Sequence, residues 1–401
     1  MTLSKPFSVA IPVLRKIIQA GHEAYFVGGS VRDYLLQRPI QDVDIATSAL
    51  PQEVKDLFSS TIDVGIEHGT ILVKYHSRTY EITTFRSESQ YRDFRRPDKV
   101  HFIRSLKEDL KRRDFTMNSL AMDENGIIID PFNGKEDMLN KQIHTVGEAS
   151  DRFQEDALRM MRAVRFVSQL GFDLSATTTD ALKEYGHLLR HIAVERIYAE
   201  MQKLLGGKNS SQSLVIIVQT GLFEFLPGMR GRKEELSKLS AYMTFLSSEE
   251  SFWVLFLFLT KCKQPKECLS QWRMSNVKKN SIYQALSVLN ERVRGPLNEH
   301  QLYLSGINTA LTVEEIYGAL ENKAVDSNLL KVKYDKLPIK QRSDLAVKGT
   351  DLMALGDRSG GPWVKKLLTD IEKAVVERDI ENEESSIKEW VKECNLLSEK
   401  K

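Results

Sequence analysis

Cysteine is scarce in this chain, and long apolar runs are missing from it. The chain has 401 residues and three cysteines, Cys262, Cys268 and Cys394, without the spacing of a metal site. This odd, dispersed set argues against a disulfide framework and indicates reduced thiols in an intracellular, cytoplasmic protein. The most apolar run, 252–259, is far shorter than the roughly 20 residues of a membrane-spanning helix. The first residues lack the apolar core of a signal peptide, so we expect no membrane association.

An excess of one charge is also missing. The chain carries 57 Lys and Arg against 55 Asp and Glu, a formal net charge of +2. Nucleic-acid binding therefore cannot be inferred from the global charge. The segment 86–114 is locally basic, with ten Lys or Arg against six Asp or Glu, a net charge of +4. It fits a basic loop near an anionic substrate or a solvated surface segment, and charge alone leaves both open.

Two further signatures are absent. No Gly-Lys-Ser/Thr follows the glycine pair at 28–29, which excludes a P-loop. None of the eight histidines is followed by aspartate, and they show no ligand spacing. The adjacent His-Asp pair marks metal phosphohydrolase domains, so we expect neither phosphatase nor phosphodiesterase activity.

The length of the chain predicts several domains, because it exceeds what one ordinary core holds. The first 150 residues alternate helical and strand patterns, and from about residue 150 the pattern is helical almost to the end. We expect helices at 6–20 and 51–58, strands at 23–27 and 43–46, and a hairpin of strands 69–75 and 79–85. The expected domains are an α+β head (1–149) followed by an all-α neck (150–208), body (209–330) and tail (331–401).

The most informative segment reads GGSVRDYLLQRPIQDVD, from Gly28 to Asp44. The pair Gly28-Gly29 follows an apolar run and opens a segment with Arg32, and such glycines let the backbone approach a phosphate closely. Asp42 and Asp44 sit two apart in a strand-like run, so we expect their side chains on one face. Two carboxylates placed this way repel unless a cation lies between them, and Mg²⁺ favours such ligands with substrate phosphates. The combination predicts phosphoryl or nucleotidyl transfer.

A second block reads RRDFTMNSLA, from Arg112 to Ala121. We expect a helix from Thr116 onward, capped by Asp114. Arg112 and Arg113 beside a helix start would suit sugar and triphosphate contacts, because the guanidinium fork matches phosphate oxygens. On its own, the same string would be read as a surface patch of salt bridges.

A third block reads EDALRMMRAVRF, from Glu155 to Phe166. An aspartate and three arginines recur in it every three residues, a spacing that forms a gently winding stripe on a helix: Asp156, Arg159, Arg162 and Arg165. A carboxylate acceptor with guanidinium donors could complement the amino group and ring acceptors of cytosine and adenine. The alternative, an ordinary surface ion pair worth about 0.2–0.5 kcal/mol, stays open on spacing alone.

Taken in order, the three blocks resemble the signature of nucleotidyltransferases related to DNA polymerase beta, in the form found in tRNA nucleotidyltransferases and bacterial poly(A) polymerases. The run Asp130-Pro-Phe-Asn-Gly134 lies between the second and third blocks, and Arg196-Ile-Tyr-Ala-Glu200 matches the family's helix that supports the nucleotide-selecting one. The segments 337–345, 351–353 and 361–363 resemble CCA-adding enzymes of Bacillus-type bacteria. The resemblance therefore covers essentially the whole chain. It implies a polymerase beta-like α+β head followed by all-α domains.

The resemblance also implies an activity, a cofactor and partners. It implies template-independent addition of CCA to the 3′ end of tRNA from CTP and ATP, with Mg²⁺ and as a homodimer. Asp42 and Asp44 would be the catalytic metal ligands. The nucleotide-binding residues it implies are Gly29, Arg32, Arg113, Asp156, Arg159, Arg162 and Arg165. Glu81 could be a third carboxylate or an exposed strand residue, and it stays outside this set.

Three alternatives compete with this interpretation. An enzyme that adds only CC would have an altered loop between the first two blocks, whereas the stretch 86–97 is similar to the full form. A bacterial poly(A) polymerase would carry Gly-Arg-Arg-Phe/Tyr after the metal strand, whereas this chain has DVGIEHGT at 63–70. A non-catalytic RNA-binding protein would not need Asp42, Asp44 and the selecting pair intact.

Overall fold

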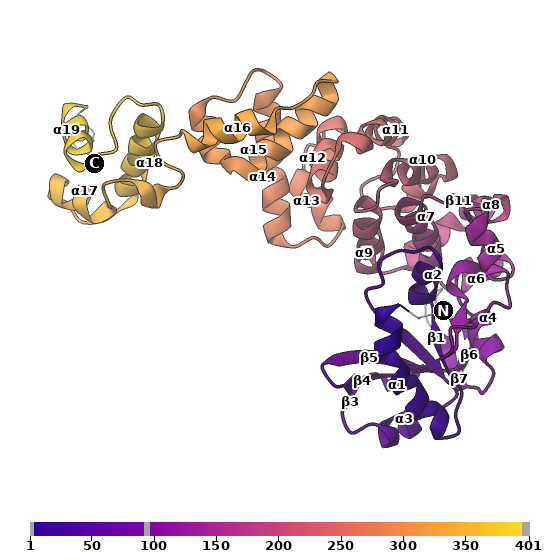
Figure 1. The fold of residues 1–401 in the computed structure, drawn as a ribbon. Coiled ribbons are helices and arrows are strands. Elements are labelled where there is room, and N and C mark those ends of the chain that lie inside the picture. The colour runs from indigo at the N-terminus through magenta and orange to yellow at the C-terminus, as the bar shows by residue number, and fades with distance from the viewer. Residues whose placement is uncertain (1–3, 92–96, 395–401) are drawn as a thin grey trace. The chain divides into compact units, whose positions relative to one another are not determined.

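The computed structural model describes residues 4–91 and 97–394. The chain divides into two compact units, Met1–Ser240 and Ala241–Lys401, whose elements are labelled in Figure 1. Within the stretch 86–97, on which the choice of full CCA addition was based, residues 92–96 lie outside the described part.

A seven-stranded sheet forms the centre of the head, with strand order β3-β4-β5-β2-β1-β8-β9. The strands are β1 (Ala24–Val27), β2 (Asp44–Thr47), β3 (Thr61–Gly65), β4 (Thr70–Tyr75), β5 (Arg78–Thr84), β8 (Ala121–Met122) and β9 (Ile128–Ile129). β4 and β5 form the expected antiparallel hairpin, while β2 pairs antiparallel with β1 and parallel with β5. The predicted α+β class of the head is confirmed.

Two helices cover one face of this sheet (Figure 1): α1 (Lys5–Gln19) and α3 (Pro51–Leu57). α1 buries Phe7, Ala10, Val13, Leu14 and Ile17, the three-and-four spacing of a helix with one apolar face. These side chains share a core with alternate residues of the strands, Ile45, Ile71, Val73 and Ile82. Because strand side chains alternate between faces, Asp44 and Glu81 point away from this core and remain exposed.

The remaining head elements surround the open face and the edges of the sheet. They are α2 (Gly29–Leu35), η1 (Ile66–His68), the separate hairpin β6 (Arg86–Tyr91) and β7 (Pro97–Phe102), α4 (Leu106–Lys111), η2 (Thr116–Asn118), α5 (Gly134–Leu139) and β10 (Gln142–Ile143).

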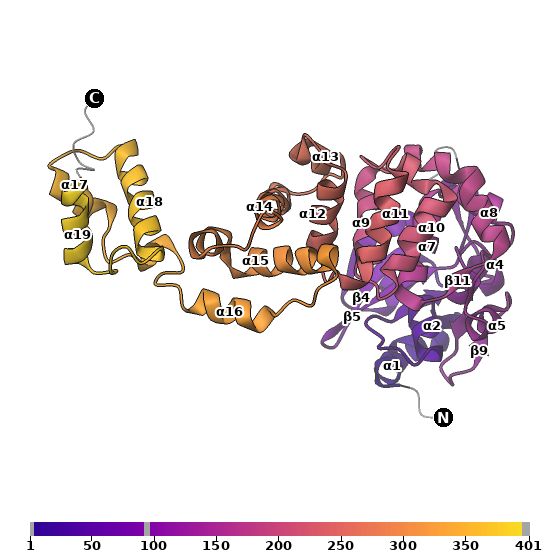
Figure 2. The same ribbon diagram turned by 90° about the horizontal axis from the view of Figure 1, so that it is seen from above.

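Helix α7 (Leu158–Leu170) is the central element of the helices that follow, with α9 (Val194–Leu205) and α10 (Ser210–Thr220) packed beside it (Figure 2). The others in the first unit are α6 (Ala149–Glu155), β11 (Asp173–Leu174), α8 (Ala176–Tyr185), η3 (Gly186–His191), η4 (Leu222–Phe225) and most of α11 (Lys233–Tyr242), whose last two residues belong to the second unit. The turn from α9 to α10 is anchored on Ser168, whose hydroxyl donates to the carbonyl of Leu204 at 2.5 Å. The backbone of Gly207 passes so close that a Cβ there would lie 2.1 Å from Ser168 Oγ.

The second unit is helical, as the sequence predicted. Its elements are η5 (Met243–Phe245), α12 (Glu249–Leu259), α13 (Pro265–Gln271), α14 (Asn276–Arg292), α15 (Glu299–Glu321), α16 (Ser327–Asp335), η6 (Arg342–Asp344), α17 (Gly349–Gly356), α18 (Pro362–Val376) and α19 (Glu384–Glu393). The apolar run at 252–259 lies in α12, where Phe252, Trp253 and Phe256 are buried against one another. Among the described residues, no helix is both long enough and apolar enough to cross a membrane.

The contact between Gly207 and Ser168 makes Gly207→Ala a test of this packing. The added methyl group would clash with Ser168 Oγ at 2.1 Å and with its backbone at 2.7 Å. We expect a loss of about 2–3 kcal/mol of stability, as is usual for overpacking a rigid site. Gly206→Ala is the matched control, because its Cβ would have 3.6 Å to the nearest backbone oxygen and its φ is −79°. Thermal unfolding compares the two, and equal melting temperatures would contradict this account.

Candidate active site

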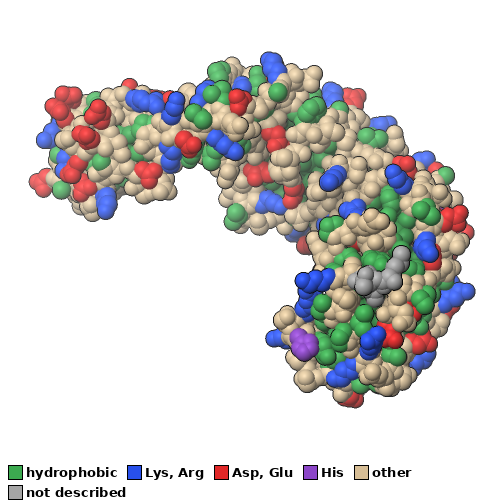
Figure 3. All heavy atoms as spheres, in the orientation of Figure 1, with side chains coloured by type: hydrophobic (Ala, Val, Ile, Leu, Met, Phe, Trp, Pro, Cys, Tyr) green, Lys and Arg blue, Asp and Glu red, His purple; other side chains and the backbone are tan. Residues whose placement is uncertain are grey.

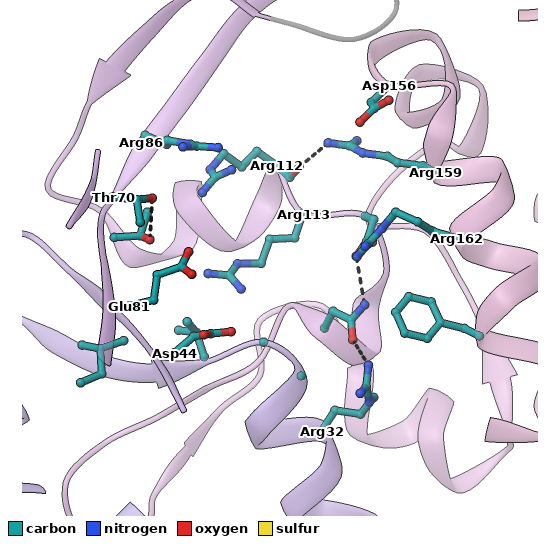
Figure 4. Close-up of a pocket in the computed structure, with 18 of the residues that line it drawn as sticks. Arg32, Asp44, Thr70, Glu81, Arg86, Arg112, Arg113, Asp156, Arg159 and Arg162 are labelled. Carbon is teal, nitrogen blue, oxygen red and sulfur yellow. Dashed lines mark hydrogen bonds and ion pairs between the residues drawn. The ribbon is translucent and has the colours of Figure 1, made fainter. Parts of the chain in front are cut away.

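A cavity of about 550 Å³ opens between the head sheet and helix α7. Figure 4 shows its arrangement, with Asp44 and Glu81 at one end, Asp156 and Arg159 at the other, and Arg113 projecting between them. All of the nucleotide-binding residues implied by the sequence line it: Gly29, Arg32, Arg113, Asp156, Arg159, Arg162 and Arg165. The structure thus brings together segments that are far apart in the chain.

The glycine pair shapes the floor of the cavity. Gly28 has φ 71° and ψ −137°, a conformation that side-chain-bearing residues rarely adopt, and it leads directly into α2. A Cβ at Gly28 would lie 3.2 Å from Arg113 Nη1 and 4.0 Å from Asp44 Oδ2. The absence of a side chain therefore leaves both charged groups open to a ligand.

Three carboxylates lie near the start of β2. Asp44 is the first residue of β2 and lies directly beside Glu81 of β5 in the sheet register. Asp42 precedes β2, because the strand begins one residue later than the predicted 43–46. Burial alternates at this point, with Val43 buried and Asp42 and Asp44 exposed, as expected for two side chains on one face. Asp42 is exposed and is not among the described residues that line the cavity.

Asp44 titrates abnormally in this setting. The Asp44 side chain is exposed to the cavity, but the surrounding protein atoms reduce its hydration and raise its pKa, and repulsion by Glu81 and Asp42 raises the pKa further. Attraction by Arg113 offsets part of this, and the pKa settles at about 6. Neighbouring carboxylates of this kind are what a cation would stabilise. Among the described residues, however, no group of three or more His, Cys, Asp or Glu is placed to hold a metal ion. Carboxylate oxygens such as these are hard ligands of the kind that divalent cations accept together with substrate phosphates.

A buried carboxylate holds the two arginines of the second block. Asp109 of α4 is only 1 % exposed, and it pairs with Arg112 at 2.8 Å and with Arg113 at 3.1 Å. Burial would raise the pKa of Asp109, but the two guanidinium groups outweigh it and hold the pKa below its ordinary value. Both arginines are thereby fixed at the edge of the cavity, where Arg86 also lies.

The expected helix from Thr116 was wrong, since η2 is a single turn of 3₁₀ helix. Strand β8 begins at Ala121 and leaves no room for a helix, and the N–H of Thr116 donates to the carbonyl of His144 at 3.0 Å. Asp114 therefore caps no helix. Its Oδ1 accepts from the N–H of Phe115 at 2.8 Å, and its Oδ2 accepts from Arg162 Nε at 2.7 Å.

The third block is not one continuous helix. Asp156 has φ −136° and ψ 102° and separates α6 from α7, with its Oδ1 accepting from the N–H of Leu158 at 3.1 Å. Its Oδ2 accepts from Arg196 at 2.9 Å rather than from Arg159. The predicted unbroken stripe was therefore wrong at its first member. The break turns the Asp156 carboxylate toward the cavity (Figure 4).

Each arginine of the stripe has its own acceptor. Arg159 donates to Glu155 at 2.7 Å and to the backbone carbonyl of Arg112 at 2.9 Å. Arg162 pairs with Asp114, and Arg165 pairs with Glu200 of α9 at 2.5 Å. The solvated surface stripe that the spacing also allowed is not what forms, because Arg159 and Arg165 are buried.

Several residues that shape the cavity were not among the sequence candidates. Phe166 lies beneath three guanidinium groups, those of Arg32, Arg162 and Arg165, at 5.2, 5.5 and 3.9 Å from its ring centre. Asn118 bridges Arg32 and Asp114 at 2.8 and 3.1 Å. Both residues belong to quoted blocks, but one sequence offers no signal that an apolar ring or an amide faces a site. The match of 196–200 to a supporting helix did point to the contacts of Arg196 and Glu200.

Known protein families and relatives match this chain along most of its length. Residues 24–144 match the family model "Poly A polymerase head domain", 171–231 match "Probable RNA and SrmB- binding site of polymerase A", and 245–391 match "tRNA nucleotidyltransferase domain 2 putative". The CCA-adding enzyme of Bacillus cytotoxicus is 46% identical over 396 residues, covering 98% of this chain and 100% of that protein. The CCA-adding enzyme of Bacillus mycoides is 47% identical over 395 residues, covering 98% and 99%.

The solved structures that resemble this chain include CCA-adding enzymes as well. The CCA-adding enzyme of Bacillus stearothermophilus in complex with CTP superposes with a TM-score of 0.89 at 42% identity, covering 98% of both chains. The Thermotoga maritima CCA-adding enzyme complexed with tRNA shares the fold, with a TM-score of 0.65 at 19% identity over 98% of this chain and 96% of that one.

The ion pair of Asp114 yields a stability prediction. Burial would raise the pKa of Asp114, but Arg162, the Asn118 amide and Arg159 hold it at about 2. Asp114→Asn leaves Arg162 without its anion, and we expect a loss of about 2–3 kcal/mol, the low end for a buried pair because Arg162 is partly exposed. The native pKa is depressed, so the pair's contribution is fully present above the unfolded-state pKa of about 3.8 and is lost as the pH falls toward 2.

Urea unfolding at several pH values checks this prediction. The difference between wild type and Asp114→Asn should be constant from about pH 5 to 8 and should shrink below about pH 4. Asp180→Asn, at an exposed pair with Lys183, is the control and should change stability by less than about 0.5 kcal/mol. A difference that grows on acidification would refute the assignment.

Proposed function

The chain belongs to the family of CCA-adding enzymes, and on that premise we propose that it adds and repairs the 3′-terminal CCA of tRNA. It uses CTP and ATP without a nucleic-acid template and releases pyrophosphate. The observation that carries the proposal is a single cavity with Asp44 and Glu81 at one end and Asp156 and Arg159 at the other (Figure 4). One nucleotide in that cavity can present its phosphates to the first pair and its base to the second.

In the proposed reaction, the 3′-hydroxyl group of tRNA gives up its proton to solvent, and its oxygen attacks the α-phosphorus of the nucleotide. A phosphodiester bond forms, the bond to the oxygen that bridges the α- and β-phosphates breaks, and pyrophosphate leaves with that oxygen. Asp42 and Asp44 would hold Mg²⁺, which when bound lowers the pKa of the hydroxyl and offsets the phosphate charge. Arg113, beside Gly28 and Asp44, is in position to bind the triphosphate. Arg32 of α2, which is held by Asp33 and Asn118, would assist Arg113 in binding the triphosphate.

We propose that Asp156 and Arg159 read the base. Asp156 accepts from the exocyclic amino group that cytosine and adenine share, while Arg159 donates to their ring acceptors. Uracil would place a carbonyl oxygen against the Asp156 carboxylate, and two acceptors cannot pair. Both groups are held by the protein and still have capacity for a base. A carboxylate offers about four lone-pair sites and a guanidinium five N–H donors, and Asp156 and Arg159 each use only part of these on protein partners.

The competing functions have less support. A poly(A) polymerase shares the head model at 24–144, but the relatives that match along the full chain are CCA-adding enzymes. A non-catalytic RNA-binding protein has no need for a poorly hydrated carboxylate beside a second one, the arrangement that raises the pKa of Asp44 to about 6. Addition of CC alone differs from CCA addition only in the last nucleotide, and product sequencing on a tRNA that lacks CCA separates the two.

The helical parts of the chain are the proposed tRNA-binding surface, with 150–208 as neck, 209–330 as body and 331–401 as tail. Lys and Arg are interspersed with Asp and Glu on the face drawn in Figure 3, in keeping with a net charge of only +2. Binding would then follow the shape and backbone of tRNA rather than its base sequence. A homodimer and a cytoplasmic location also remain proposals.

Removal of the proposed metal ligands tests the reaction. We expect Asp44→Ala and Asp42→Ala each to lower the rate of CMP addition by about 100-fold or more, because charge developing on the phosphates is no longer balanced. Asp63→Ala is the control, since Asp63 lies on β3 and pairs with Lys55. Rates are measured at saturating Mg²⁺ on tRNA lacking CCA. Variants that stay within a few-fold of wild type would remove these residues from the metal site.

The choice of nucleotide is tested with Asp156→Ala. The variant should use CTP and ATP less well and discriminate less against UTP and GTP, by about 5- to 150-fold, the cost of an unpaired buried polar group. The measurement is kcat/KM for single-nucleotide addition with each of the four nucleotides. Asp151→Ala, an exposed change in α6, is the control. Unchanged ratios in both Asp156→Ala and Arg159→Ala would mean that this region does not read the base.

A further inference from the structure

The run Asp130-Pro-Phe-Asn-Gly134 has no role in the reaction described above. In the structure it forms the turn that starts α5. Asp130 Oδ1 accepts from the N–H of Gly134 at 2.8 Å, and its Oδ2 accepts from the N–H of Lys135 at 2.9 Å. Asn133 between them is left-handed, with φ 60°. The first turn of α5 is therefore fixed by one carboxylate.

Gly134 brings this turn into backbone contact with η2. A Cβ at Gly134 would lie 2.3 Å from the carbonyl oxygen of Thr116, 2.8 Å from its carbonyl carbon and 3.2 Å from the N atom of Met117. These are backbone atoms and cannot rotate away as a flexible side chain could. Only glycine allows α5 to approach η2 this closely.

A second contact joins the same two elements. Thr116 Oγ1 donates to Asp137 Oδ2 at 2.5 Å, and the other oxygen of Asp137 contacts His144 Nδ1 at 2.8 Å. The N–H of Thr116 donates to the carbonyl of His144. Thr116 is thus held through both its backbone and its side chain. These bonds fix the position of η2 relative to α5.

The other end of η2 faces the cavity. Asn118 is 7 % exposed and has opposite partners on its amide: Oδ1 accepts from Arg32 Nη1 at 2.8 Å, and Nδ2 donates to Asp114 Oδ1 at 3.1 Å. An arginine can only donate and a carboxylate can only accept, so the orientation of this amide is determined. Asp114 in turn pairs with Arg162 of α7. A shift of η2 would lengthen the bonds to Arg32 and Asp114 together.

We propose that Gly134, Thr116 and Asp137 are positioning residues for nucleotide binding, acting through Asn118 without touching the nucleotide. They hold η2 so that Asn118 keeps Arg32 and Asp114 in place in the lining of the cavity. The inference rests on the proposed function, because its readout is the affinity for CTP and ATP. Base choice is set elsewhere, so the preference for CTP and ATP over UTP and GTP should not change.

Substitutions at Thr116 test the hydroxyl contact. Thr116→Val keeps the shape and removes the donor, whereas Thr116→Ser keeps the donor. We expect Thr116→Val to raise KM for both CTP and ATP about tenfold, the value of one hydrogen bond to a charged group, with kcat changed less than about twofold. Thr116→Ser should restore KM. Thr220→Val is the control, a buried threonine of α10 whose hydroxyl donates to the carbonyl of Ile216.

A double-mutant cycle with Asn118→Ala separates positioning from general destabilisation. If Thr116 acts through Asn118, Thr116→Val should add little to KM in the Asn118→Ala background. A merely structural role would lower the melting temperature and leave the two effects on KM additive. Gly134→Ala should resemble Thr116→Val with a larger rise in KM, compared with Gly206→Ala as its control.

The outcomes are distinct. A wild-type KM in Thr116→Val, no restoration by Thr116→Ser, or full additivity with Asn118→Ala would overturn the inference. If Gly134→Ala or Thr116→Val does not fold, Asp137→Ala removes the same contact from the α5 side and decides the question. Failure of the wild-type protein to add any nucleotide would instead overturn the proposed function.

Discussion

The ion pair between Asp114 and Arg162 sets the spacing of the two ends of the cavity. Asp114 comes from the segment that carries Arg113, and Arg162 comes from the helix that follows Asp156. Because Asp114 is buried and its pKa is held at about 2, it stays ionised at any physiological pH. The groups proposed to bind the phosphates and those proposed to read the base are therefore joined by a contact that does not titrate at physiological pH. Asn118 extends the same contact to Arg32.

The arginines of the cavity are organised before any ligand arrives. Asp109, Asp114, Glu155 and Glu200 each hold at least one guanidinium group, and Phe166 lies against three. Free arginine side chains lose much rotamer freedom on binding, and this loss is avoided when they are already fixed. Asp44 and Glu81 are the opposite case, because reduced hydration and repulsion by Glu81 raise the pKa of Asp44 to about 6, and a bound cation would counter both effects. Such a conflict is typical of functional sites rather than of cores.

The sequence predicted what depends on periodicity and on motif order. The alternation of apolar and polar residues located β1, β2 and the β4–β5 hairpin. The change from a mixed to a helical residue pattern near residue 150 predicted the helical remainder. Predictions failed where a tertiary contact overrides a local pattern. The helix expected from Thr116 could not form because β8 begins at Ala121 and pairs with β1. The break at Asp156 was hidden, since an unbroken helix satisfies the same three-residue spacing. The roles of the site residues remain predictions.

The ion pairs of α7 limit how freely the parts of this chain could be exchanged with those of relatives. The partners of Arg159, Arg162 and Arg165 come from α6, from the head and from α9. A chimaera joined near residue 150 would inherit Asp114 from one parent and Arg162 from the other. If the donor sequences differed at either place, a charge would be left buried and unpaired, at a cost of several kcal/mol. Head and neck would therefore have to be inherited together, although the composition of the chain changes at their junction.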